Sequence, residues 1–147
     1  PTTSSAASDV YKRQVLAAAA STKVVFNPAP FNEVVPAVLP LADVVIVNRR
    51  EAEQLGDVQV PVLITTLGAR GCEVKVGSDI TTIEAPKVEV ADPTGAGDAF
   101  VGAFSVAYVD TEDAVAAALI AVRAGAAAVR GVGAQPSMPT WEQIDNV

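Results

Sequence analysis

The chain has 147 residues, half of them hydrophobic, and a formal net charge of −7. This length allows one substantial core but no second full domain, and the acidic balance argues against nucleic-acid or anionic-membrane surfaces, which need clustered Lys and Arg. Histidine is absent and cysteine occurs once, which excludes Ser-His-Asp and Cys-His catalysis, histidine metal sites and an internal disulfide.

The same counts indicate the surroundings of the protein. No apolar run in the sequence reaches membrane-spanning length. The single Cys72 stands in an alternating segment that is typical of a small buried hydrophobe rather than of a reactive thiol. We therefore expect a soluble protein of the reducing cytoplasm that binds small molecules, and any acid–base chemistry in it must use carboxylates.

The first 14 residues differ from the rest of the chain. They are polar and rich in Ser, Ala and Thr, and they lack both the apolar centre of a signal peptide and helical periodicity. We interpret 1–14 as a non-native or disordered segment, with translated adapter sequence and a flexible native linker as the alternatives. The fold is then expected in 15–147, where 15–20 has the pattern of the end of a helix.

Short β-branched runs then alternate with helical segments. This order predicts an α/β fold of three layers, α/β/α, with a mostly parallel sheet. Two later runs flank the turn 77–79 and predict an antiparallel hairpin at the sheet edge. The expected strands are 23–26, 43–47, 60–65, 72–76 and 80–83, and the expected helices are 32–39 and 49–55.

The last third of the chain is rich in alanine, which is typical of closely packed helices. Thr140 and Gln143 stand at capping-box spacing before a short last helix. The other expected elements are a strand-like segment at 87–90, helices at about 97–108 and 111–129, and a Gly/Pro loop at 130–139.

The most informative motif is the run 92–100, where two glycines and an acid lie between the 87–90 segment and a helix. Glycines let a ligand approach the backbone, and the first N–H groups of a helix are unpaired donors at the positive end of its dipole. The run predicts an anion site in which Asp98 can act as a base. The alternative is a simple connection in which the helix dipole alone favours Asp98.

Two other polar clusters come directly after expected strands. In open parallel sheets, ligands bind beyond the carboxyl ends of the strands, which is where these clusters are expected. Asn48 and Glu51 can face a phosphate and, through water, a divalent cation, but Asn followed three residues later by Glu is also capping-box spacing. The glycine-containing loop 65–71 can approach a nucleotide or be an ordinary turn.

The combination and order of these motifs resembles the carbohydrate kinases of the ribokinase family from about residue 15 to the C-terminus. The family signature is matched by Asp92-x-Thr94-Gly95-Ala96-Gly97-Asp98, its Asn-x-x-Glu motif by 48–51 and its nucleotide loop by 66–71. Segments 26–30 and 133–139 are most similar to the ribose-specific members. The resemblance implies a ribokinase-like fold whose N-terminal half, with the Gly-Gly substrate motif, the sugar-binding acid and the β-sheet lid, is absent from this chain.

The resemblance also implies a role for each motif. Asp98 would bind the sugar and take the proton from its primary hydroxyl, while the amides of Gly95, Ala96 and Gly97 stabilise the transferring phosphoryl group. ATP would lie along Asn48 and the nucleotide loop, with its phosphates near Gly97 and Asp98. The loop residues are Thr66, Leu67, Gly68, Ala69, Arg70 and Gly71.

Two cations are implied as well. Glu51 would help to organise Mg²⁺ through water. K⁺ is the expected activator, held mostly by backbone carbonyls, although Asp92 followed by Pro93 has the simpler interpretation of starting a turn. The residues implied for the monovalent cation are Asp92, Thr94, Ala128, Gly131, Gly133 and Ser137.

Two positions depart from the family pattern. Val122 stands where the family often has Asn or His near the adenine, so no side-chain hydrogen bond to the base is expected there. Gly131 stands where larger residues occur in the family, so only its carbonyl can serve a cation.

We therefore expect the C-terminal, ATP-binding part of a kinase that phosphorylates a sugar's primary hydroxyl, with D-ribose to D-ribose 5-phosphate as the expected reaction. A fructokinase, a nucleoside kinase or another relative is the alternative among enzymes, and a non-catalytic α/β binding fragment is the alternative outside them. ATP and a small sugar are the expected partners, and the full-length protein is expected to form a homodimer. The isolated chain is expected to be inactive and to aggregate, because half a fold exposes a sheet face and edge.

Overall fold

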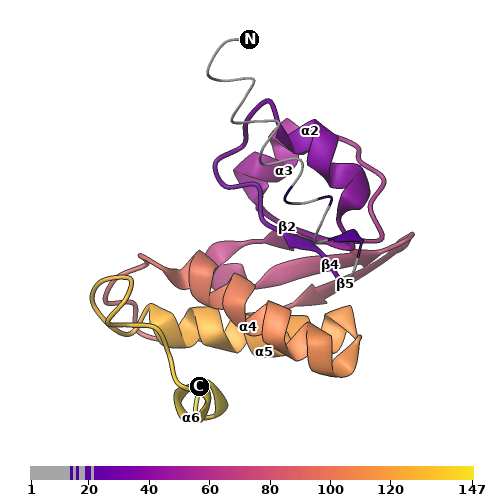
Figure 1. Ribbon diagram of the computed structural model, residues 1–147. Helices are drawn as coiled ribbons and strands as arrows, with labels where there is room; N and C mark the ends of the chain where they lie inside the picture. Colours follow the sequence, from indigo (N-terminus) through magenta and orange to yellow (C-terminus); the bar gives the residue numbers. More distant parts are fainter. Residues whose placement is uncertain (1–13, 15, 17–18, 21) are drawn as a thin grey trace.

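The computed structural model describes residues 14, 16, 19–20 and 22–147 (Figure 1). The predicted non-native segment 1–14, apart from residue 14, lies outside these residues, as does part of the helix end predicted at 15–20. The described strands form one five-stranded sheet in the order β1-β2-β3-β4-β5. Among the described residues, no helix has the length and hydropathy needed to cross a membrane.

The sheet is parallel on one side and antiparallel on the other. β1, β2 and β3 run parallel, and the predicted hairpin adds β4 and β5 antiparallel at the edge, so the described sheet is mixed. β2 is apolar on both faces until its last residue, as expected of a strand covered on both sides. The strands are β1 (Val25–Phe26), β2 (Val44–Asn48), β3 (Val62–Thr66), β4 (Cys72–Val76) and β5 (Asp79–Ile83).

Helices cover both faces of the sheet and complete the predicted three layers (Figure 1). Because successive side chains of a strand point to opposite faces, Val44 and Ile46 pack toward α4 (Ala96–Thr111) and α5 (Ala114–Ala128). Val45 and Val47 belong to a second cluster on the other face. That face is covered by α2 (Val35–Val38), the 3-10 turn η1 (Leu39–Leu41) and α3 (Arg49–Leu55).

Local chemistry explains where the helices differ from expectation. The predicted helix 32–39 is confined to α2 and η1, since Pro40 has no N–H with which to continue an α-helix. α5 begins three residues later than predicted because Asp113 is its N-cap, with Oδ1 accepting the N–H groups of Val115 and Ala116 at 2.9 and 3.0 Å. The capping box of Thr140 and Gln143 is confirmed at the start of α6 (Trp141–Asp145).

The predicted strand-like segment 87–90 is wrong: residues 84–90 have no regular secondary structure. Pro86 cannot donate a ladder hydrogen bond. The chain instead runs from the sheet edge toward the end of α5, where the N–H groups of Ala91 and Asp92 both donate to the Val129 carbonyl at 2.8 and 3.1 Å. This irregular segment therefore lies beside the helices rather than in the sheet.

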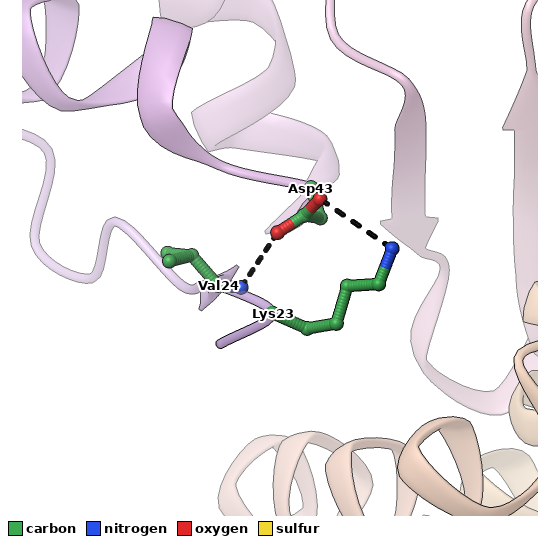
Figure 2. Close-up of polar contacts among 3 residues, drawn as sticks. All are labelled: Lys23, Val24 and Asp43. Atoms are coloured by element: carbon green, nitrogen blue, oxygen red, sulfur yellow. Dashed lines mark hydrogen bonds and ion pairs between the residues drawn. The ribbon is translucent and has the colours of Figure 1, made fainter. Parts of the chain in front are cut away.

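Asp43 holds the amino-terminal ends of β1 and β2 together (Figure 2). Its Oδ2 accepts the N–H of Val24 at 2.8 Å, and its Oδ1 lies 3.9 Å from the Nζ of Lys23. The ion pair is partly exposed and contributes at most about 1 kcal/mol. Since the functional motifs follow the strands, this contact lies at the opposite end of the sheet from the candidate site.

Candidate functional site

The carboxyl ends of β2 and β3 bring two of the predicted motifs side by side. Asn48 and Thr66 are register partners in the parallel pair, and the Thr66 hydroxyl donates to the Val47 carbonyl at 3.4 Å. The loop after Thr66 closes on itself, because the N–H of Leu67 donates to the carbonyl of Gly71 at 2.8 Å. The first residue of the Asn-x-x-Glu motif and the start of the 66–71 loop thus lie side by side.

A pocket of about 550 Å³ lies beside this loop, between the irregular segment that follows β5 and the facing sides of α4 and α5. It joins the nucleotide loop to the turn that begins α4, two motifs far apart in the sequence. Leu67 and Arg70 do not line it. The residues of the two motifs that do line it are Thr66, Gly68, Ala69, Gly71, Ala96 and Gly97.

The inner wall of the pocket is apolar. Phe100 of α4 and Val122 of α5 are both 5% exposed and face the pocket. Gly125 lies on the side of α5 that faces α4, and a Cβ there would make only an ordinary contact with the Ala96 carbonyl oxygen, at 3.4 Å. An apolar slot of this kind fits the flat face of a nucleobase.

The N-terminus of α4 forms the polar rim. Gly95 is its N-cap and has a φ of 84°, a conformation that favours glycine. A side chain on Gly97 would meet no atom within 4 Å, so there is open space in front of this turn. Asp98 is exposed in the first turn of the helix and stands beside the pocket, without lining it.

Asn48 and Glu51 form a complete capping box at the start of α3. Asn48 Oδ1 accepts the Glu51 N–H, and Glu51 Oε2 accepts the Asn48 N–H, both at 2.9 Å. The capping interpretation is therefore confirmed. It engages one oxygen of each side chain, so contact of Asn48 with ATP and a role of Glu51 toward Mg²⁺ stay predictions.

Asp92 ties the turn before α4 to the Gly/Pro loop. Its Oδ1 accepts the Thr94 N–H and its Oδ2 accepts the Gly133 N–H, each at 2.9 Å. Hydrogen bonds from the Thr94 side chain and N–H, and from the Gly133 N–H, hold the pKa of Asp92 below its ordinary value. The Asp92–Thr94 contact is the predicted turn, and the Gly133 contact brings the loop to the same carboxylate.

Of the other residues implied for a monovalent cation, Gly131, Gly133 and Ser137 lie in this loop, and Ala128 is the last residue of α5. The Ser137 hydroxyl donates to the Gly133 carbonyl, and the Gly131 N–H donates to the Ala128 carbonyl at 3.3 Å. Gly131 is required by this packing, because a Cβ there would lie 2.7 Å from the Cβ of Ser137. The loop presents carbonyl oxygens, and the described residues hold no cluster of three or more His, Cys, Asp or Glu that could bind a metal ion.

The sequence motifs did not reveal one wall of the pocket. Residues 85–88 and Val90 line this wall. Because 87–90 was expected to be a strand of the sheet, these residues were not predicted to belong to the pocket. The apolar and proline residues directly before the glycine run were the available signal. Cys72 behaves as interpreted: it is fully buried, and burial raises its pKa to about 12.

Comparison with known proteins identifies similar chains. Residues 3–141 match the family model described as pfkB family carbohydrate kinase. Ribokinase of Staphylococcus aureus (strain COL) is 30% identical over 151 residues, which covers 90% of this chain and 50% of that protein. Other relatives are a deoxyribokinase of Salmonella typhi and a nucleoside kinase of Methanocaldococcus jannaschii.

Solved structures show the same likeness. Thermotoga maritima ribokinase superposes with a TM-score of 0.79 at 26% identity, covering 86% of this chain and 48% of that one. A fructokinase from Vibrio cholerae O395, in its fructose-, ADP- and calcium-bound form, superposes with a TM-score of 0.71 at 27% identity, covering 84% and 50%. The chain spans about half the length of the first curated relative it matches.

Proposed function

The chain belongs to the pfkB family of carbohydrate kinases, and we propose that it is the C-terminal, ATP-binding part of a kinase that phosphorylates the primary hydroxyl of a sugar. The observation that carries the proposal is the single pocket shared by the 66–71 loop and the first turn of α4. A nucleotide in that pocket has an apolar slot for its base and the first N–H groups of α4 near its phosphates. Of these, the Ala96 N–H makes only a long hydrogen bond to the Pro93 carbonyl, at 3.4 Å. The fructokinase relative bound to ADP and fructose supports this chemistry.

We propose the following division of roles. The base lies against Phe100 and Val122, and the phosphates lie toward Ala96 and Gly97, whose amides stabilise the transferring phosphoryl group. Asp98, one residue further along α4, accepts the proton of the attacking hydroxyl. The sugar pocket would come from the half of the relatives' length that this chain does not span.

The cations proposed for the reaction fit the donors present. Glu51 already accepts a hydrogen bond at Oε2, so it fits a metal held mainly by water and phosphate oxygens, as Mg²⁺ is. Mg²⁺ supplies charge neutralisation of the phosphates when bound. The carbonyl groups of the 128–137 loop fit K⁺ as an activator, with Asp92 holding the loop through Gly133. We further propose that the complete protein forms a homodimer and is located in the cytoplasm.

D-ribose is the proposed sugar because segments 26–30 and 133–139 are most similar to ribose-specific members, and relatives named ribokinase match across most of the chain. Fructose, deoxyribose and nucleosides are the alternatives, since other relatives are named fructokinase, deoxyribokinase and nucleoside kinase. Residues outside this chain would decide between them.

The test begins with the genomic DNA upstream of codon 15. We expect the reading frame to continue into an N-terminal half with a Gly-Gly motif and a sugar-binding acid. The complete protein, assayed with ATP, Mg²⁺ and K⁺, should phosphorylate D-ribose with a higher kcat/KM than fructose, deoxyribose or nucleosides. A complete protein that phosphorylates none of them contradicts the proposal of a kinase, and a preference for another substrate contradicts only the proposal of ribose.

A further inference from the structure

Lys87 lines the pocket, although no motif in the sequence pointed to it. It lies in the irregular segment between β5 and α4, and it shares the pocket with Ala96 and Gly97 of the α4 N-terminus. Its acidic neighbours Glu84 and Glu89 do not line the pocket. Within this segment the lysine therefore lines the pocket, whereas the two acids do not.

The charge of the pocket makes this placement significant. Of the described residues that line the pocket, Lys87 carries the single charged side chain. The whole chain has a net charge of −7, and Asp98 stands directly beside the pocket, so the surroundings oppose a polyanion. The N-terminus of a helix supplies only about half of a positive charge. Mg²⁺ and the helix N-terminus together still leave a nucleoside triphosphate with net negative charge, so a further cation close to its phosphates favours binding.

The chemistry of lysine suits that task. Its ammonium group is a compact charge with three donors on a flexible four-carbon stem, so it can follow a phosphate without a fixed fork geometry. The remaining side chains of the pocket are apolar apart from Thr66, so they suit the uncharged base of a nucleotide. Among the ligand's groups, the phosphates are the ones that a positive charge would bind. A lysine side chain beside this apolar slot therefore fits the phosphate end of a nucleotide.

We propose that Lys87 binds a phosphate group of the nucleotide and so contributes to affinity for ATP but not for the nucleoside. The inference rests on the proposed function, because it takes the pocket to be the ATP site. It adds a binding residue that lies outside the 66–71 loop and the 92–98 signature.

The test measures the affinity of the complete protein, expressed from its full reading frame, for ATP with Mg²⁺ and for adenosine by saturation-transfer difference NMR. Lys87→Met is compared with Lys75→Met, which removes the same charge from β4, outside the pocket. We expect Lys87→Met to weaken ATP binding about tenfold, the usual value of one hydrogen bond to a charged group, while adenosine binding is unchanged. Lys75→Met should change neither, and added salt should weaken ATP binding less in Lys87→Met than in the unsubstituted chain.

Three results would overturn the inference. Unchanged ATP affinity in Lys87→Met would show that the side chain does not bind a phosphate. An equal loss of ATP and adenosine affinity, with an unchanged melting temperature, would show that Lys87 acts by packing against the nucleoside. Binding of neither ligand to the unsubstituted chain would overturn the proposed ATP site itself, an outcome distinct from the first two because no substitution is involved.

Discussion

Gly71 occupies a position that only glycine fills without displacing its neighbours. Its φ is 96°, and a Cβ there would lie 1.9 Å from the Ile83 carbonyl oxygen and 2.8 Å from the Ala85 nitrogen. The backbone leaving β5 thus crosses directly over Gly71 at the wall of the pocket. The glycine of the nucleotide loop therefore has a structural function in addition to its proposed role in ATP binding.

Substitution of Gly71 by alanine should destabilise the fold more than substitution of Gly77. Gly77 also has a positive φ, of 60°, but a Cβ there would have no atom within 4 Å. Gly77→Ala should lower the free energy of unfolding by about 1 kcal/mol, the cost of the left-handed conformation. Gly71→Ala should lose about 1–3 kcal/mol more through the clash. Urea unfolding of both variants measures the difference, and equal losses would contradict the close backbone crossing.

Asp98 is the residue on which the proposed catalysis depends. In the complete protein, Asp98→Asn should lower kcat by about 10²–10⁴-fold, the usual contribution of a general base, and leave ATP affinity nearly unchanged. Asp110→Asn, at the other end of α4, is the matched control and should retain activity. Normal turnover by Asp98→Asn would instead support a residue placed there only by the helix dipole.

Asp92 should make stability depend on pH in the acid range. Its pKa is lowered from 3.8 in the folded chain, so its contribution to stability is fully present above that value and is lost as pH falls through the folded pKa. Asp92→Asn should therefore be less stable than the unsubstituted chain at pH 6, and the difference should shrink as the pH approaches 2. Denaturant unfolding at both pH values checks this. A difference that does not change with pH would contradict the assigned hydrogen bonds.

Single residues show what sequence could predict of the site. The motif glycines, Thr66 and the Thr140–Gln143 capping box depend on spacing along the chain, and the structure places them as that spacing indicates. Lys87 could not be found in this way. Its position in the pocket results from where the chain goes after β5, which no local pattern specifies.

At the scale of elements, Asn48 at the N-terminus of α3 caps the helix and is also proposed to contact ATP. One substitution distinguishes these two roles. Asn48→Ser keeps a side-chain oxygen for the N-cap but removes the amide group. If Asn48 contacts ATP, Asn48→Ser should weaken ATP binding several-fold at nearly unchanged stability, whereas Asn48→Ala should lose about 1 kcal/mol of stability as well. Calorimetric titration and thermal unfolding of both variants measure the two effects. Unchanged ATP affinity in Asn48→Ser would leave capping as the function of this residue.

Elements were predictable where their signals are local. The strands β2 and β3, the hairpin of β4 and β5, and α3 follow from hydrophobic pattern, turn residues and caps. The irregular structure of 84–90 was not predictable, because its apolar residues suit a strand but in the structure form a wall of the pocket. Whether such a run joins a sheet depends on a neighbouring strand with which to pair, and that is tertiary information.

At the scale of the whole molecule, the three layers were predictable from the alternation of elements, but the pocket volume and its apolar wall were not. The wall forms where α4 and α5 lie side by side next to a loop from the sheet, and it combines residues of both helices, such as Phe100 and Val122. Fold class is fixed by pattern, whereas the shape of a site depends on contacts between distant parts of the chain.

The isolated chain is expected to associate with itself. The large hydrophobic side chains of Val106 and Val109 on α4 and of Leu119 on α5 are more than half exposed. Such apolar surfaces favour association. Sedimentation velocity of the 147-residue chain should show species larger than a monomer that grow with concentration. A monomer that melts cooperatively would contradict this expectation.

The most direct test of nucleotide binding in this pocket is hydrogen–deuterium exchange of the complete protein with and without saturating ATP and Mg²⁺. We expect slower exchange in three separate regions that meet at the pocket, namely 66–71, 85–97 and 122–126, with unchanged exchange at the hairpin turn 77–78. Unchanged exchange in all three regions, or slower exchange confined to other parts of the chain, would show that this pocket is not where the nucleotide binds.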